Sequence, residues 1–249
     1  PMVPADTKQS VKSTLTKMAD GGVGDVDDAC HYKPEYAWNY EVGTHLNLLE
    51  GCLAVDASAF VSDVRNLQLS QMSETGLGRI TVNAGRSRSM GAELAAKALI
   101  ASRLALTASY GYTHATLRNY TTYDAATSAV IDCRGKRVPF IPDHTISVDA
   151  AYTFPLAQRS DAPSLTLAAT YLGTGRIFWD EPNSFSQPFH STFDARASLA
   201  LLGDHLHIDL AARNIFNASY NVFAFTSMSR RYEQHCRPRQ FTLGVRWHF

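Results

Sequence analysis

The alternation of large apolar residues with small or polar ones constrains the fold of this chain more than any other feature. It is clearest at the C-terminus, where every second residue is large and apolar: Phe241, Leu243, Val245, Trp247 and Phe249. The residues between them are Thr242, Gly244, Arg246 and His248. A repeat of two residues places neighbouring side chains on opposite faces of a β-strand. The pattern therefore predicts a strand with one apolar and one polar face.

The same alternation returns in eight further segments, near 38–42, 53–61, 90–94, 104–112, 146–154, 165–171, 193–201 and 206–212. This gives about nine strands of roughly ten residues, the length that crosses a bilayer at the tilt of barrel strands. The polar faces carry Asp, Arg, Glu and His, which are costly to bury in a dry core but not in a wet lumen. We therefore predict an all-β fold, an antiparallel transmembrane β-barrel portion.

Composition excludes several other classes of protein. The 249 residues hold 23 basic and 23 acidic side chains, so no net charge favours general binding of nucleic acid. No stretch approaches the roughly 18 apolar residues of a membrane-spanning helix. A soluble all-β sandwich, such as a carbohydrate-binding domain, is a competing interpretation. It would bury the apolar rows against a second sheet.

The connections between the predicted strands alternate strictly in length. Short ones fall near 48–51, 100–102, 155–163 and 202–205, and long ones near 71–86, 117–143, 175–190 and 217–239. Outer-membrane barrels have short periplasmic turns and long extracellular loops, so the last strand is expected to end in the periplasm. Single-chain bacterial barrels have an even number of strands, with both chain ends in the periplasm. Nine strands, the first of which begins on the extracellular side, do not fit this rule, and an open sheet of nine strands would leave unpaired edges in lipid. We therefore expect the C-terminal part of a larger barrel, or a further strand hidden in residues 1–36.

Five segments in order along the chain carry a family resemblance. They are 34–43 (PEYAWNYEVG), 83–94 (NAGRSRSMGAEL), 135–145 (GKRVPFIPDHT), 213–220 (RNIFNASY) and the run from Pro238-Arg239 to Phe249. Together they resemble the C-terminal barrel region of TonB-dependent outer-membrane receptors, particularly those for ferric siderophores. Asn217 stands where the family usually has Asp. The resemblance implies a 22-stranded type of barrel, with residues 37–249 as its C-terminal region and residues 1–36 as a polar, loop-like segment.

This resemblance implies a receptor and transporter for a ferric siderophore or a similar large nutrient, in the outer membrane of a Gram-negative-type bacterium. The chain would supply barrel wall and extracellular loops, without the family's plug domain. Implied partners are the siderophore-like ligand, the TonB energy-transducing complex acting through that plug, outer-membrane lipid and the barrel-assembly machinery. That machinery would read the apolar row of the last strand as an insertion signal. The alternative is a free-standing small outer-membrane barrel, a pore or hydrolase, closed by a strand within residues 1–36.

Candidate ligand contacts combine arginines with aromatic residues in two long loops: Arg176, Trp179, Arg230, Arg231 and Tyr232. Such side chains suit an anionic iron chelate through charge and cation–π contact. No catalytic constellation is expected. Asp180, His190 and Ser191 are close in sequence, but no GxSxG motif accompanies them.

No phosphate-cradling motif and no cluster with metal-ligand spacing occurs, so neither a cofactor nor a bound metal is expected. The four cysteines are Cys30, Cys52, Cys133 and Cys236. They form no CxxC pair, and incidental thiols are the simpler interpretation. A bridge between Cys133 and Cys236, which lie in two of the long loops, stays open.

Overall fold

The computed structural model describes residues 33–72, 79–83, 85–101, 103–124, 129–159, 162–227 and 230–249. The polar segment expected over residues 1–36 lies almost wholly outside them, and the first strand begins at Tyr36. Apart from one 3-10 turn at Leu49–Gly51, all regular structure in these ranges is β-strand. None of the described residues forms a helix long and apolar enough to cross a membrane.

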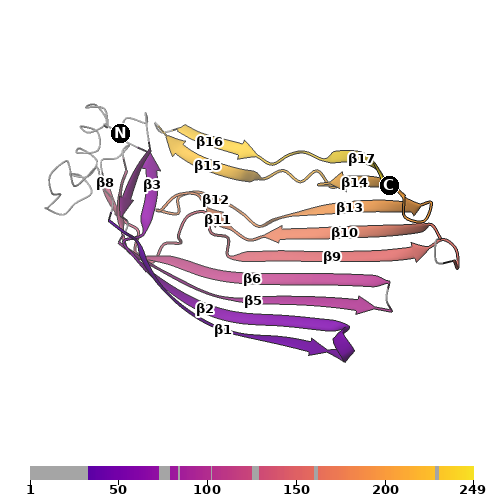
Figure 1. Ribbon diagram of the computed structural model, residues 1–249. Coiled ribbons are helices and arrows are strands. Elements are labelled where there is room, and N and C mark those ends of the chain that lie inside the picture. The colour runs from indigo at the N-terminus through magenta and orange to yellow at the C-terminus, as the bar shows by residue number, and fades with distance from the viewer. Residues whose placement is uncertain are drawn as a thin grey trace.

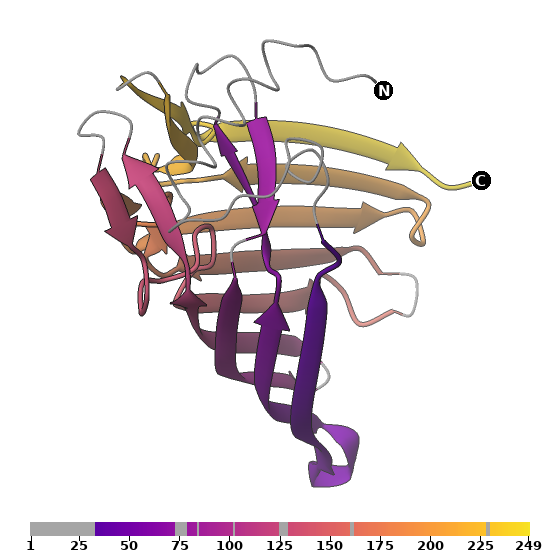
Figure 2. The same ribbon diagram turned by 90° about the vertical axis from the view of Figure 1, so that its left-hand side faces the viewer.

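Nine strands form one antiparallel sheet in which each strand pairs with its neighbours along the chain. Their order is β1 (Tyr36–Leu48), β2 (Leu53–Arg65), β5 (Arg86–Ile100), β6 (Leu104–Asn119), β9 (His144–Pro155), β10 (Ser164–Thr174), β13 (His190–Leu201), β14 (Leu206–Arg213) and β17 (Gln240–Trp247). Figures 1 and 2 show a single curved and twisted layer. The prediction of nine antiparallel strands is confirmed. Within the described ranges, β1 and β17 are the two ends of this sheet.

The register brings the apolar rows of the separate strands onto one continuous face. Val245 lies opposite Ile208, which lies opposite Leu199, which in turn lies opposite Leu165. This face is uncovered, since Leu167 on β10, in the middle of the sheet, is 45% exposed and Leu243 on the end strand β17 is 69% exposed. A soluble sandwich would bury these side chains, so that alternative is wrong. A face of this kind is stable where it contacts hydrocarbon.

The opposite face carries the polar residues, and several of them interact across strands. Thr170 donates a hydrogen bond of 2.6 Å to the Asp149 carboxylate, and Arg246 lies 3.2 Å from the Asp209 carboxylate. Gly91 also lies on this face, where a Cβ atom would come within 2.7 Å of the Phe60 ring. A residue without a side chain is therefore needed there to let Phe60 lie across the sheet.

The two ends of the sheet differ as the loop lengths predict. One end has only the 3-10 turn and three short connections, at 101–103, 156–163 and 202–205. The other end, on the left of Figure 1, carries the long loops, and each contains a two-stranded hairpin. The sequence did not predict these hairpins: β3–β4 (Gln68–Met72, Arg79–Asn83), β7–β8 (Thr121–Asp124, Ala129–Asp132), β11–β12 (Ile177–Phe178, Ser186–Gln187) and β15–β16 (Asn221–Ser227, Arg230–His235).

Candidate ligand-binding site in the long loops

A small hydrophobic core anchors the loops to the end of β6. The backbone N–H of Leu117 donates to the carbonyl of Lys136 at 2.9 Å, and that of Val138 donates to the carbonyl of Ala115 at 3.0 Å. The segment after β8 thus continues the sheet beside β6. Its buried residues are Ala115, Leu117, Tyr120, Cys133 and Val138. Burial of this kind gives the loops a fixed base.

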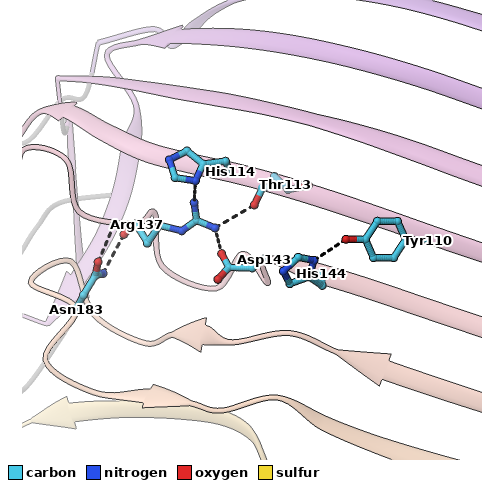
Figure 3. A network of polar contacts seen from close by, with 7 residues as sticks. All are labelled: Tyr110, Thr113, His114, Arg137, Asp143, His144 and Asn183. Carbon is cyan, nitrogen blue, oxygen red and sulfur yellow. Dashed lines mark hydrogen bonds and ion pairs between the residues drawn. The ribbon is translucent and has the colours of Figure 1, made fainter.

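Arg137 joins this core to the next loop. Its guanidinium donates to Nδ1 of His114 and to the carbonyl of Thr113 at 3.0 Å, and it forms an ion pair with the Asp143 carboxylate (Figure 3). Its backbone pairs with the Asn183 side-chain amide, which accepts at 2.7 Å and donates at 3.0 Å. A guanidinium with several partners holds a fixed geometry, so the connection before β9 and the β11–β12 hairpin are fastened together.

Five aromatic side chains form a connected series across three loops, which we name the aromatic row: Trp179, Phe140, Phe223, Phe225 and Tyr232. Successive ring centroids are 5.7, 5.7, 5.7 and 5.1 Å apart. Rings at these distances attract one another in offset or edge-on arrangements. The row starts in the β11–β12 hairpin, passes through the segment before β9 and ends on β16.

Phe140 occupies the middle of the aromatic row with a backbone φ of 66°. Bulky residues rarely adopt this left-handed conformation, which costs of order 1–3 kcal/mol. The position is held by a hydrogen bond of 2.9 Å from its N–H to the carbonyl of Phe178, and by its two aromatic neighbours. Strain of this size at a loop position is typical of functional sites.

The structure places two of the five predicted ligand contacts, Trp179 and Tyr232, in the aromatic row, and a third, Arg231, against Phe185. Trp179 is buried at one end of the aromatic row, at 6% exposure, and Tyr232 is 45% exposed at the other end. The guanidinium of Arg231 lies 4.5 Å above the ring of Phe185, whose carbonyl accepts from the Trp179 N–H at 3.2 Å. The exposed part of the row, around Phe140 and Tyr232, offers ring faces for stacking to a flat ligand.

The other two predicted contacts stand apart from the row. Arg230 begins β16 as an exposed residue, opposite Ser227. Arg176 is exposed, and its carbonyl accepts from the Asp143 N–H at 3.3 Å, next to the Arg137 contacts. Across the described ranges, neither guanidinium contacts the aromatic row.

Four phenylalanines of this site were missed by the sequence interpretation: Phe140, Phe185, Phe223 and Phe225. The spacing of Phe223 and Phe225 is a signal for a short strand, which β15 confirms. Phe140 lies inside the GKRVPFIPDHT segment that carried the family resemblance. Nothing in the sequence brings the three loops together, because that depends on contacts between distant segments.

Burial shifts the pKa of several titratable groups in the loops, among them Glu181 and Cys133. Burial raises the pKa of the Glu181 carboxyl above its ordinary value, and the neighbouring Asp180 raises it further. Burial likewise raises the pKa of the Cys133 thiol, to about 11. A thiol with such a pKa is a weak nucleophile and a poor metal ligand at neutral pH.

The remaining candidates from the sequence are not assembled into a site. Cys52, Cys133 and Cys236 are free thiols, so the bridge left open between Cys133 and Cys236 is absent. Asp180 accepts hydrogen bonds from Ser184, whereas His190 stacks on Tyr220. Across the described part of the chain, no three His, Cys, Asp or Glu side chains are placed to hold a metal ion.

The terminal apolar row lies on the outward face of β17. Phe241, Leu243, Val245 and Trp247 are at least half exposed, and Phe249 is fully exposed. The backbone near the chain end is held to the preceding turn, since the His248 N–H donates to the His205 carbonyl at 2.8 Å. The row is thus available to lipid or to another protein.

Comparison with known proteins places these features in a family. A family model described as TonB dependent receptor-like, beta-barrel matches residues 14–217. The ferrichrome outer membrane transporter/phage receptor of Escherichia coli K12 is 28% identical over 202 residues, 79% of this chain and 24% of the relative. The metal-pseudopaline receptor CntO of Pseudomonas aeruginosa PAO1 is 29% identical over 195 residues, 76% of this chain and 25% of the relative.

Solved structures show the same fold. The ferric yersiniabactin uptake receptor FyuA from Yersinia pestis superposes with a TM-score of 0.72 at 20% identity, covering 86% of this chain and 30% of FyuA. The siderophore receptor PiuA from Acinetobacter baumannii gives 0.67 at 20% identity, covering 85% and 28%. The chain spans about a quarter of the length of the curated relatives it matches. On the family match, this chain belongs to the TonB-dependent receptors, outer-membrane proteins of Gram-negative bacteria, and its strands are part of their β-barrel.

Proposed function

We propose that this chain is part of a receptor that binds a ferric siderophore, or a similar anionic metal chelate, with its long extracellular loops. The receptor then takes part in import of the chelate, and it has no enzymatic role. The relatives support this proposal, since they are named as receptors or transporters for ferrichrome and metal-pseudopaline. The family consists of transport receptors.

The observation that carries the proposal is the aromatic row, together with Arg231, which lies on the same strand as Tyr232 and packs over Phe185. Siderophore ligand groups are flat and often aromatic, and their iron complexes are commonly anionic. Aromatic side chains stack on such groups, while a guanidinium supplies charge and hydrogen bonds in the same plane. Because the row joins side chains of three loops, ligand choice would depend on how these loops pack.

Partners beyond the ligand follow from the family. We infer that the TonB energy-transducing complex drives import through a plug domain, and that outer-membrane lipid covers the apolar face. The terminal row from Phe241 to Phe249 is proposed as the segment that the barrel-assembly machinery recognises. Phe249→Asp should then reduce the amount of receptor assembled in the outer membrane. His248→Asp is the control, because His248 is the neighbouring residue and belongs to the polar set that alternates with the apolar row. This variant should assemble normally.

Ligand binding is tested with the full protein in detergent, using ferric complexes of a catecholate and of a hydroxamate chelator as probes in calorimetry. Arg231→Ala should weaken binding of the anionic probe about tenfold to a hundredfold, the loss expected for a charge-assisted contact. Arg231→Lys keeps the positive charge but lacks the planar guanidinium, so it should lose less affinity for the anionic probe than Arg231→Ala does. Arg134→Ala is the control, because Arg134 is an exposed arginine of the β8–β9 connection paired with Asp132. Equal affinity of the Arg231→Ala and Arg134→Ala proteins would contradict the proposal.

A further inference from the structure

We propose that His114 is a proton-controlled positioning residue of the loop site, which holds the segment around Phe140 in place while its ring is neutral and releases it when the ring gains a proton. His114 lies on β6, directly before Ala115, the first buried residue of the loop core. Its ring meets the guanidinium of Arg137 (Figure 3). The link to ligand binding rests on the proposed function, whereas the response of the segment to protons does not.

The chemistry of this contact fixes the protonation state of His114. A guanidinium carries five N–H donors and no acceptor, so the ring nitrogen that faces it has to accept. In the structure this nitrogen is Nδ1, which faces Nη1 of Arg137. The ring is therefore neutral, with its proton on Nε2. Protonation turns both ring nitrogens into donors, which removes the hydrogen bond and places a second positive charge against Arg137.

The surroundings of His114 do not offset a charge on its ring. The residue directly opposite on β5 is Met90, which is uncharged. In the described part of the chain, the carboxylates near the ring are already paired with arginines, so an added proton meets mainly cations and is repelled. The charged and titratable groups around the ring come from three sides: Arg118 and Tyr112 on β6, Arg88 with its partner Asp63 on the side of β5, and Arg137, Asp143 and His144 in the segment that leads into β9.

Arg137 passes a change at His114 to the aromatic row. Phe140 follows Arg137 by three residues, and its strained φ of 66° is held from outside, by the Phe178 carbonyl at 2.9 Å. When Arg137 is displaced from His114, this strained turn loses the fixed base on one side. Phe140 can then relax away from its aromatic neighbours. Ligand affinity should therefore be highest at the higher pH, where His114 is neutral, and should fall as histidine gains its proton.

The first test follows hydrogen exchange over residues 133–143 in the full protein in detergent, at about pH 8 and about pH 5. All proteins carry Glu181→Gln, since the raised pKa of the Glu181 carboxyl gives the neighbouring hairpin a pH dependence of opposite sign. After correction for intrinsic exchange, the open fraction of the segment should be about tenfold larger at the lower pH, the loss expected for one charge-assisted hydrogen bond. An unchanged open fraction would overturn the proposal.

Two substitutions of His114 separate proton control from packing. His114→Asn places a side-chain oxygen near the position of Nδ1, where it accepts from Arg137 and gains no proton. The segment should then stay closed at both pH values. His114→Lys is positively charged at both, so the segment should be about tenfold more open already at the higher pH. If His114 only filled space, the two variants would give the same profile, and that result would overturn the proposal.

His144→Asn is the matched control, because Nδ1 of His144 contacts the Tyr110 hydroxyl at 2.8 Å instead of a guanidinium. This protein should keep the full pH dependence of the segment. Loss of that dependence in His144→Asn would assign the titration to His144 and would overturn the proposal for His114.

Chelate affinity gives a second readout. The ferric catecholate and ferric hydroxamate probes are measured at the two pH values with the proteins that have or lack His114→Asn. Between the higher and the lower pH, the protein with His114 should lose about tenfold more affinity than the variant does. Protonation of the chelate itself affects both proteins alike. Equal losses would overturn the link between His114 and the ligand. Binding of neither probe would contradict the proposed function, while the exchange profile would still decide the role of His114.

Discussion

Leu243 and Leu117 are the same residue type in two regions of one chain, with opposite surroundings. Leu243, in the barrel wall, is 69% exposed, whereas Leu117, at the loop end of β6, is fully buried. The wall places apolar side chains outward because hydrocarbon covers them, while the loop layer folds like a small water-soluble domain around Leu117 and Cys133. A substitution should therefore have opposite consequences in the two regions.

The largest effect is expected from a charge on the lipid-facing side of the wall. Ala150 and Ala151 are adjacent in β9, and each lies between two small or apolar partners, but they point to opposite faces. Ala150→Arg should lower the free energy of unfolding by about 2–4 kcal/mol, the cost of arginine facing the middle of a bilayer. Ala151→Arg, which faces the lumen, should cost far less. Urea unfolding in lipid vesicles measures both, and equal losses would remove the distinction between the faces.

A smaller and more local effect is expected when the contacts of the Arg137 side chain in the loops are removed. Arg137→Ala leaves the Asp143 carboxylate without its cation and should destabilise the loop layer by about 1.5–3 kcal/mol. Hydrogen exchange should show faster opening over residues 133–143 with unchanged protection in β9 and β10. Arg134→Ala removes an exposed arginine whose contact with Asp132 is 3.7 Å long, so it should change exchange by less than about 1 kcal/mol. Loss of protection throughout the wall would mean that the two regions unfold together.

The smallest effect concerns pH. Since burial raises the pKa of Glu181, the folded loop binds this proton more tightly than the unfolded loop does. Stability of the β11–β12 hairpin is therefore highest below the ordinary carboxyl pKa and falls as pH rises through the raised value. Hydrogen exchange followed from pH 4 to pH 8 should show this decline, and Glu181→Gln should abolish it. A hairpin whose protection rises with pH would contradict the assignment.

The barrel wall could be predicted from sequence because, in each strand, residues that face lipid alternate with residues that face the lumen. Alternation around Ile208 and Val245 gave both the strands and the outward face, and the strict alternation of loop lengths gave the two ends of the sheet. Strand limits were underestimated at the loop end of several strands, and also at the turn end of β1 and β5. Residues such as Arg88 and Leu117 extend the strands beyond the apolar band, where the lipid no longer dictates the pattern.

The loop site could be predicted only in part. Arginine and aromatic content was enough to select Trp179 and Tyr232 of the aromatic row, but it did not separate them from Arg176, Arg230 and Arg231, which lie outside the row. The missing information is three-dimensional: Phe140 and Phe223 stack although 83 residues separate them in the sequence. No local pattern encodes such a contact, because its energy appears only after both loops have folded.

The side-chain amide of Asn183 substitutes for a strand partner by pairing with both backbone groups of Arg137. As a consequence, the segment that holds Phe140 and the hairpin that holds Trp179 have no independent freedom at this point. A molecule that pushes either one must displace both, and the energy of that displacement adds to the discrimination between molecules of different size. Selectivity would then be encoded in an uncharged amide that never touches the cargo.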